Sequence, residues 1–166
     1  MIKVGKVIKA IRIDERLIHG QVAVTWCSAL NVDSIVVAND KASQDEVSVI
    51  SLKMAAPANV KVAIKNMEDS IEILSDPRIK TKNVLVLVTN PMDALKLIET
   101  VPDMPFVNVG NYGMIDEKEH NKILATSLAV TLEDIKYFEK IISIKPDSNY
   151  QMTPTLKPLM LKDLIK

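Results

Sequence analysis

The sequence predicts an α/β protein with a mostly parallel central sheet and helices on both faces. Short apolar runs rich in β-branched residues recur along the 166 residues, and they are continuous rather than alternating. Continuous runs are typical of strands that are covered on both faces. Segments with apolar residues at helical spacing separate these runs, and the linkers between them are only a few residues long. Such alternation favours parallel strands joined by helices.

Six apolar runs are predicted to be strands. They are KVIKAIRI at 6–13, SIVVAN at 34–39, VKVAI at 60–64, NVLVLVT at 83–89, FVNVG at 106–110 and SLAV at 127–130. The chain beyond residue 148 is less regular. There we expect an antiparallel edge strand over 150–153, followed by a short helix or an extended tail.

Five segments with helical spacing are predicted to be helices: 20–30, 43–56, 66–75, 90–100 and 131–143. Ser43, followed three residues later by Glu46, predicts a capping box at the start of the second helix. Pro91 lies near the start of the fourth helix, where a missing N–H costs little. Thr131 and Asp134 repeat the capping pattern at the start of the fifth.

Composition limits the class of protein. With 48% hydrophobic and 25% charged residues, the chain is expected to form one globular domain over residues 1–166. Its 21 basic and 21 acidic side chains cancel, which argues against a nucleic-acid-binding protein. No apolar run suits a signal peptide or a membrane span, so we expect a cytoplasmic protein. Cys27 is the only cysteine, which argues against an internal disulfide and a cysteine-bound metal.

Ligand sites in open α/β sheets lie outside the carboxyl ends of the strands. Polar and small residues gather at four of the predicted ends: His19, Asn39 with Asp40, Thr89 with Asn90, and NVGNYGM at 108–114. Asn39 and Asp40 either line a site or cap the next helix. Asn108 and Gly110 belong to a loop that either wraps the edge of the site or needs its glycines for a tight turn. We treat these four as candidate substrate-binding residues.

The stretch IRIDERLIHGQVAVTW changes from strand to helix at His19. Imidazole is a good nucleophile near neutral pH, and the free N–H groups at a helix start favour an anion. Arg12 and Arg16 are close in sequence, and guanidinium groups suit phosphate oxygens. Asp14 or Glu15 would accept a hydrogen bond from the ring nitrogen that does not react, or from an arginine, and so fix the orientation. This combination fits a phosphoryl carrier.

Other interpretations of these residues are open. A lone histidine at a strand end is more often structural, and arginine–carboxylate clusters are usually solvated ion pairs. A non-catalytic α/β regulatory module would use His19 to bind an anion or a partner. The chain lacks the G-x-S-x-G motif of a serine triad, and DERLIHG replaces the dinucleotide fingerprint. His120 is expected on the surface, and Trp26 is expected in the core rather than on a partner surface.

The motif RIDERLIHGQVAVTW resembles the signature of a known family. This family is the sugar-specific enzyme IIB component of the bacterial phosphoenolpyruvate-dependent phosphotransferase system, in its mannose/fructose/sorbose class. SIVVANDKAS, LKMAAPANVKVAI, VLVLVTNPMDALKLIE and VNVGNYGM also resemble that family, in the same order. The resemblance covers roughly residues 5–145 and is looser over the last twenty. Glu15 stands where the motif often has aspartate.

The resemblance implies a single IIB-like phosphocarrier domain with a mainly parallel sheet. His19 would take a phosphoryl group from a phosphohistidine of IIA and donate it to a sugar that the membrane components IIC and IID carry inward. Arg12 and Arg16 would stabilise the phosphoryl group, and Asp14 would orient the ring or an arginine. No cofactor or metal is expected. The expected partners are IIA, the IIC/IID transporter beside which the protein would act, the sugar, and further copies of this chain, since family members often associate.

Overall fold

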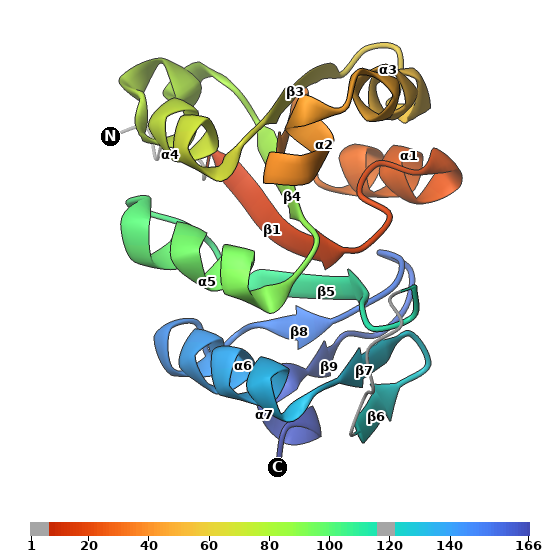
Figure 1. Ribbon diagram of the computed structural model, residues 1–166, viewed down its shortest axis with the longest axis vertical. Helices are drawn as coiled ribbons and strands as arrows, with labels where there is room; N and C mark the ends of the chain where they lie inside the picture. Colours follow the sequence, from red (N-terminus) through yellow and green to blue (C-terminus); the bar gives the residue numbers. More distant parts are fainter. Residues whose placement is uncertain (1–6, 116–121) are drawn as a thin grey trace.

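The computed structural model describes residues 7–115 and 122–166, and within these ranges it has a seven-stranded sheet in the order β3-β2-β4-β1-β5-β8-β9 (Figure 1). The strands of this sheet are β1 (Ile8–Asp14), β2 (Ser34–Ala38), β3 (Lys61–Lys65), β4 (Val84–Val88), β5 (Val107–Asn111), β8 (Asn149–Tyr150) and β9 (Leu159–Met160). The pairs from β3 to β8 are parallel, and β8 pairs with β9 antiparallel. The mostly parallel sheet predicted from the sequence is confirmed.

Helices cover both faces of this sheet (Figure 1). One face carries α1 (Gly20–Ala29), α2 (Asp40–Gln44) and α3 (Glu46–Ala55), and the other carries α4 (Met67–Ser75), α5 (Pro91–Thr100) and α6 (Leu132–Ile144). A 3-10 helix, η1 (Pro77–Thr81), follows α4, and the short α7 (Leu161–Leu164) follows β9. Two apolar cores result, one on each side of the sheet. Among the helices so described, none is long and apolar enough to cross a bilayer.

The central strands form because both of their faces are buried. All five residues of β4, VLVLV, are buried, and each fully buried aliphatic side chain contributes roughly 1.5–3 kcal/mol. In β1 the alternation of side chains places Ile11 and Ile13 in the core under α5 and α6. Ala10, Arg12 and Asp14 therefore face α1. This alternation brings two charged residues into a buried position.

The strand predicted at 127–130 lies outside the main parallel sheet. It forms β7 (Leu128–Val130), which pairs antiparallel with β6 (Lys122–Ala125) in a separate two-stranded sheet. The sequence did not predict β6, since none of its four residues KILA is buried and they form no long apolar run. A bridge between Tyr112 and Leu128 ties this pair to the end of β5. His120 lies outside the described residues.

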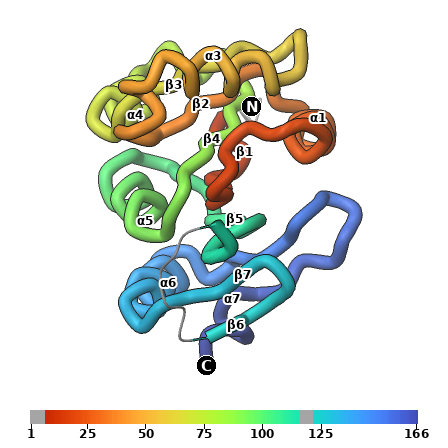
Figure 2. Tube along the Cα trace, turned by 45° about the vertical axis from the view of Figure 1, so that its right-hand side comes forward, coloured from red at the N-terminus to blue at the C-terminus, as the bar shows by residue number. Residues whose placement is uncertain are grey.

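The C-terminal edge also differs from the prediction. The strand expected at 150–153 is β8, which lies inside the sheet and is parallel to β5, while the antiparallel edge strand is β9. Beyond Tyr150, the backbone oxygens of Gln151 and Met152 accept from the side chain of Arg12 rather than from a neighbouring strand. The segment between β8 and β9 therefore leaves the sheet as a long loop (Figure 2). The expected short helix is confirmed as α7.

One helix start was predicted wrongly. Ser43 belongs to α2, and α3 begins at Glu46 with Asp45 as its N-cap, whose carboxylate accepts a hydrogen bond from Val47 N at 3.3 Å. The chain turns at Asp45, which is in an extended conformation, so 43–56 cannot be one helix. The capping box of Thr131 and Asp134 at the start of α6 is confirmed.

Candidate functional site

A tight turn after β1 brings His19 back against Asp14. Leu17 N donates to the backbone oxygen of Asp14 at 3.0 Å, and Leu17 has a φ of 58°, a conformation that costs a non-glycine residue of order 1–3 kcal/mol. Gly20, with a φ of 36°, then starts α1. The turn thus puts the histidine at the N-cap position of α1, beside the carboxyl end of β1.

His19 pairs with Asp14 through one ring nitrogen. Its Nε2 lies 3.2 Å from Asp14 Oδ2, and its side chain is 24% exposed. Although His19 occupies the N-cap position, its side chain does not cap the helix. Within residues 7–115 and 122–166, Nδ1 forms no hydrogen bond. The carboxylate therefore fixes the Nε2 edge of the ring, and Nδ1 is the nitrogen that can react.

Asp14 is buried, yet it is held as a carboxylate by its surroundings. Burial alone would raise its pKa, but the hydrogen bond with His19 and the charge of Arg12 together lower the pKa below its ordinary value. Its Oδ2 lies 3.5 Å from Arg12 Nη2, and its Oδ1 accepts from Arg16 N at 3.1 Å. The expectation that Asp14 or Glu15 serves the histidine ring is thereby decided in favour of Asp14.

Arg12 is buried beneath this pair. Its Nη1 donates to Asn108 Oδ1 and, at 2.9 Å, to the backbone oxygen of Gln151, while Nη2 donates to the backbone oxygen of Met152 at 2.9 Å. Its guanidinium carbon lies 4.8 Å from the centre of the Trp26 ring. Burial lowers the pKa of Arg12 to about 10, against the opposing effect of Asp14, so the group stays charged at neutral pH.

Asn108 and Gly110 support Arg12 rather than face solvent. Both are buried, and alternation along β5 places them on the same side of the sheet as Arg12. A Cβ on Gly110 would lie 1.9 Å from Arg12 Nη2, so this glycine provides space for the guanidinium. The alternative of a tight turn is wrong for Gly110, whereas Gly113 does have a positive φ of 79°.

The side chains of Asn39 and Asp40 accept hydrogen bonds at the starts of helices. Asn39 caps α2 by accepting from Ala42 N at 2.8 Å, and Asp40 accepts from Met67 N at the start of α4 at 2.7 Å. They follow β2, and β4 separates β2 from β1. The capping alternative is confirmed for Asn39, whereas Asp40 bonds the start of α4 rather than capping the next helix. The structure does not bring these two residues into contact with His19.

The side chains of Arg16 and Glu15 make different contacts. Arg16 is 40% exposed, and its Nε is 3.5 Å from Asp14 Oδ1. The carboxylate of Glu15 accepts from Met114 N at 3.0 Å and from Ile115 N at 3.2 Å, which fastens the loop after β5. Of the two arginines, Arg16 is therefore the one whose side chain is partly exposed to solvent.

Sequence reasoning missed the contribution of the C-terminal loop. The backbone oxygen of Met152 accepts from Arg12 and also from the indole Nε1 of Trp26, at 3.0 Å. Trp26 is buried, as expected for a core residue. No side chain in the loop sequence marks this contact, because the acceptors are backbone carbonyls.

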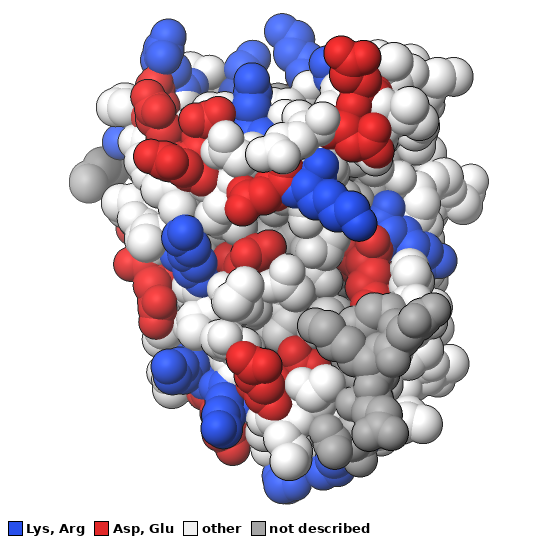
Figure 3. Space-filling model, viewed as in Figure 1, with Lys and Arg blue, Asp and Glu red and all other residues white. Residues whose placement is uncertain are grey.

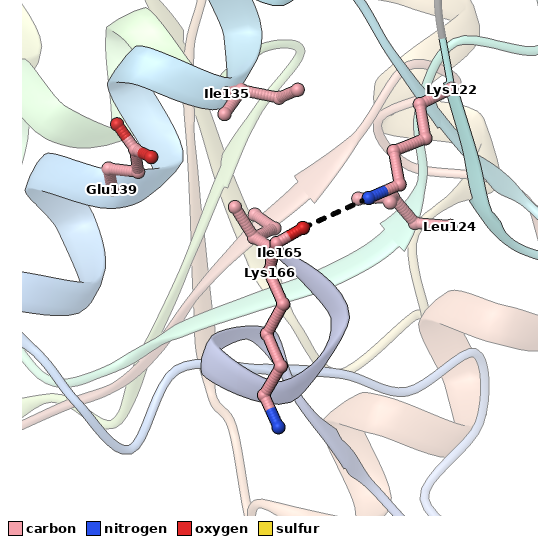
Figure 4. Close-up of a pocket in the computed structure, with 6 residues that line it drawn as sticks. All are labelled: Lys122, Leu124, Ile135, Glu139, Ile165 and Lys166. Atoms are coloured by element: carbon pink, nitrogen blue, oxygen red, sulfur yellow. Dashed lines mark hydrogen bonds between the residues drawn. The ribbon is translucent and has the colours of Figure 1, made fainter.

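Hollows elsewhere on the described surface lie away from His19. One of about 130 Å³ lies between β6, α6 and α7, where Lys122 Nζ donates to the backbone oxygen of Lys166 at 3.2 Å (Figure 4). Another, of about 350 Å³, is lined by side chains of α6. Among the residues with described positions, no group of three or more His, Cys, Asp or Glu side chains could hold a metal ion.

This arrangement suits an anion at His19. The first α1 backbone bond, from Ala23 N to His19 O at 3.3 Å, leaves the N–H groups of the preceding turn available to an anion. Arg16 adds a partly exposed positive charge, and the ring offers Nδ1. A phosphoryl group on that nitrogen would meet donors from the helix start and from the turn.

Comparison with known proteins identifies the family. The family model "PTS system sorbose subfamily IIB component" matches residues 8–166, and so extends through the last twenty residues, where the resemblance was expected to be loose. A protein of Streptococcus pyogenes serotype M6 named "Probable phosphotransferase enzyme IIB component" is 38% identical over 95% of this chain and 99% of its own length.

Two further similarities agree. The mannose-specific EIIAB component of Escherichia coli K12 is 31% identical over 96% of this chain, which spans 48% of that protein. The crystal structure of the IIBSor domain of the sorbose permease from Klebsiella pneumoniae has a TM-score of 0.87 at 27% identity, covering 95% of both chains. The chain therefore belongs to the sorbose subfamily of IIB components of the phosphotransferase system, which are phosphoryl-transfer components of sugar transport.

Proposed function

We propose that this chain is a phosphocarrier whose His19 accepts a phosphoryl group from a phosphohistidine of IIA and donates it to a sugar. The observation that carries the proposal is the contact between His19 Nε2 and the buried carboxylate of Asp14. A carboxylate only accepts hydrogen bonds, so of the two tautomers of the imidazole it favours the one with its proton on Nε2. Nδ1 then keeps the lone pair that a nucleophile needs.

The transfer proceeds in two displacements. In the first, the Nδ1 lone pair bonds to phosphorus while the bond from phosphorus to the donor histidine breaks, and that electron pair stays on the donor ring. In the second, a sugar hydroxyl oxygen bonds to phosphorus, the bond to Nδ1 breaks with its electrons returning to the ring, and the hydroxyl proton leaves to a base beside the sugar. Little more than positioning and charge stabilisation is required of the protein.

The two arginines have separate parts in this proposal. Arg16 and the first N–H groups of α1 stabilise the phosphoryl oxygens, since the Arg16 side chain is partly exposed and α1 begins directly after His19. Arg12 has both terminal nitrogens bonded to protein oxygens, and it acts by fixing the carboxylate of Asp14.

The family supports the partners that we infer. PTS IIB components work with IIA and with the membrane components IIC and IID, and the EIIAB name of the Escherichia coli relative joins a IIA to a IIB component. We infer that residues 1–166 act as a single phosphocarrier domain on the cytoplasmic side of that transporter.

Formation of sugar phosphate tests the proposal. Membrane vesicles that contain IIC and IID are supplied with phosphoenolpyruvate, the general phosphotransferase proteins, IIA and this chain. We expect sugar phosphate to form with the wild type and not with His19→Ala. Equal product with the two proteins would refute the role of His19. Nitrogen-15 NMR of the phosphorylated protein then reports whether phosphorus is bonded to Nδ1, as expected, or to Nε2.

A further inference from the structure

We propose that Trp26 is a positioning residue for phosphoryl transfer at His19, acting through Arg12 and the backbone carbonyl of Met152. This inference rests on the proposed function, because it assigns a supporting part to a residue that does not touch the reacting ring. Trp26 is the only tryptophan of the chain and lies on α1, two turns after His19. Its side chain is buried, with 6% exposed.

Trp26 holds Arg12 in two ways. The guanidinium carbon of Arg12 lies 4.8 Å from the centre of the indole ring, within the range of a cation–π contact, and tryptophan is the best aromatic partner for a cation. The indole N–H also donates to the backbone oxygen of Met152 at 3.0 Å, and that oxygen accepts from Arg12 Nη2 at 2.9 Å. The ring fixes one side of the guanidinium, and the shared carbonyl fixes its direction.

The position of Arg12 affects His19 through one atom, Oδ2 of Asp14. Asp14 Oδ2 lies 3.5 Å from Arg12 Nη2 and 3.2 Å from His19 Nε2. If the guanidinium turns away, Oδ2 loses its second partner and becomes free to move from the ring. The ring then loses the contact that keeps the proton on Nε2, and the protonation of Nδ1 competes with attack on phosphorus.

This pattern exceeds what a packing role needs. Any buried indole N–H needs an acceptor, but the acceptor here is the same backbone oxygen that bonds Arg12, and it lies 126 positions away in sequence. The residue thereby connects α1, the end of β1 and the loop after β8 at one point. A side chain without this N–H and ring face would fill the same space and leave Arg12 less constrained.

The test compares three variants with the wild type. Trp26→Leu removes both contacts, and Trp26→Phe keeps an aromatic face but removes the N–H. Phe138→Leu is the matched control, because Phe138 is fully buried on the opposite side of the sheet and has no contact with Arg12. The rate of transfer from phosphorylated IIA and its KM are measured by rapid quench. Nitrogen-15 shifts of His19 report the tautomer, and thermal unfolding reports stability.

We expect Trp26→Leu to lower the transfer rate about 10- to 100-fold, which is the size expected for a misplaced reacting group, with little change in the KM for IIA. Its His19 signals should show both tautomers, while the wild type shows Nε2–H. Trp26→Phe should lose only about 2- to 5-fold because its ring still faces the cation. Phe138→Leu should lower the melting temperature and leave the rate and the tautomer unchanged.

A folded Trp26→Leu that transfers at the wild-type rate with an unchanged tautomer would overturn the proposal, as would an equal loss of rate in Phe138→Leu. If Trp26→Leu fails to fold, Trp26→Phe decides, and values equal to those of the wild type would overturn the proposal. If the wild type accepts no phosphoryl group from active IIA, the proposed function itself is refuted. The two failures are therefore distinguishable.

Discussion

Asp14 organises the side chains around His19. Its buried carboxylate contacts the guanidinium of Arg12 on one side and the histidine ring on the other, and it also accepts from the backbone of Arg16. A buried ion pair is worth little by itself, but breaking one leaves an uncompensated charge in the interior. We therefore expect the site and the stability of the protein to depend on this one side chain.

Replacing Asp14 with asparagine tests that dependence. Asp14→Asn keeps the shape of the side chain but leaves Arg12 without its counter-charge, which should lower the free energy of unfolding by about 3–5 kcal/mol. Phosphoryl transfer should slow by about 10²- to 10⁴-fold, because the amide can present either its oxygen or its NH2 group to the ring and no longer sets the tautomer. Urea unfolding and single-turnover kinetics measure the two effects.

The matched control is Asp163→Asn, which removes a 62% exposed carboxylate from its surface pair with Lys166. Its effect on the free energy of unfolding should stay within about 0.5 kcal/mol. Equal losses in the two variants would contradict the role assigned to Asp14.

Asp14 also predicts a pH dependence of stability. Although burial acts against it, the hydrogen bond with His19 and the charge of Arg12 keep the pKa of Asp14 below its ordinary 3.8 in the folded protein. The unfolded chain keeps the ordinary pKa of 3.8, so between the folded pKa and pH 3.8 it binds more protons at Asp14 than the folded protein does. The stabilisation is therefore complete above pH 3.8 and is lost as the pH falls through the folded pKa.

Urea unfolding of the wild type and Asp14→Asn at a series of pH values measures this contribution. The difference in unfolding free energy between them should shrink below pH 3.8. Asp93, whose pKa is raised by burial, acts in the opposite direction but is common to both proteins. A difference that stays constant down to pH 2 would contradict this account.

Gly110 is required for space rather than for backbone freedom. Gly110→Ala would place a methyl group 1.9 Å from Arg12 Nη2, so the guanidinium must move, and overpacking of this kind typically costs about 1–3 kcal/mol. In the background of Arg12→Met, which removes the guanidinium, the same substitution should cost much less. Urea unfolding of the four proteins gives the coupling free energy. Additive losses would show that the methyl group clashes with something other than Arg12.

At the residue scale, the sequence predicted the charged motif but not all of its connections. Spacing on a strand and turn placed Asp14, Arg16 and His19 together, and the structure agrees. The surroundings of Arg12 were not predictable, because two of its acceptors are backbone oxygens 139 and 140 positions away. Asn108 and Gly110 share its face by strand alternation, so knowledge of the strand order would have placed them beside it.

Among the secondary-structure elements, the start of α3 is the clearest departure from sequence expectation. Ser43 and Asp45 are both good N-cap residues, and the sequence pattern favoured Ser43. Asn39 already caps α2 just before them, so the chain completes a short helix and needs a second cap at Asp45. Local pattern alone could not distinguish one helix from two.

The two caps can be compared directly. Asp45→Ala should lower the free energy of unfolding by about 0.5–2 kcal/mol, because it removes the acceptor at the start of α3. Ser43→Ala should change it by less than about 0.5 kcal/mol, since Ser43 lies within α2 and its hydroxyl only bonds the backbone of Asp40. Urea unfolding of both variants checks the order. A larger loss for Ser43→Ala would restore the single-helix interpretation.

The remaining differences at the level of elements have a common origin. Apolar runs identified β1, β2, β3, β4 and β5, which are five neighbouring strands of the main sheet, and also β7 of the separate pair. The strands that were missed or misplaced, β6, β8 and β9, are short and have tertiary partners that local sequence does not reveal. Apolar periodicity reports burial on two faces, so it weakens wherever a strand is short or exposed.

Across the whole molecule, the topology puts the turn that carries His19 at the carboxyl edge of the central strands. β1 lies between β4 and β5, and the chain returns from β8 to bond Arg12 and Trp26 from the opposite end of the sequence. On the face shown in Figure 3, acidic and basic side chains are interspersed, in keeping with the balanced charge of the chain.

The most direct test of the central claim is the mass of the intact protein after phosphorylation. The chain is incubated with phosphoenolpyruvate, the general phosphotransferase proteins and IIA, and is kept alkaline to preserve phosphohistidine. We predict one added phosphoryl group in the wild type and in His120→Ala, which removes the only other histidine, and none in His19→Ala. A wild type that gains no phosphoryl group while IIA is itself phosphorylated, or a His19→Ala variant that gains one, would contradict the account.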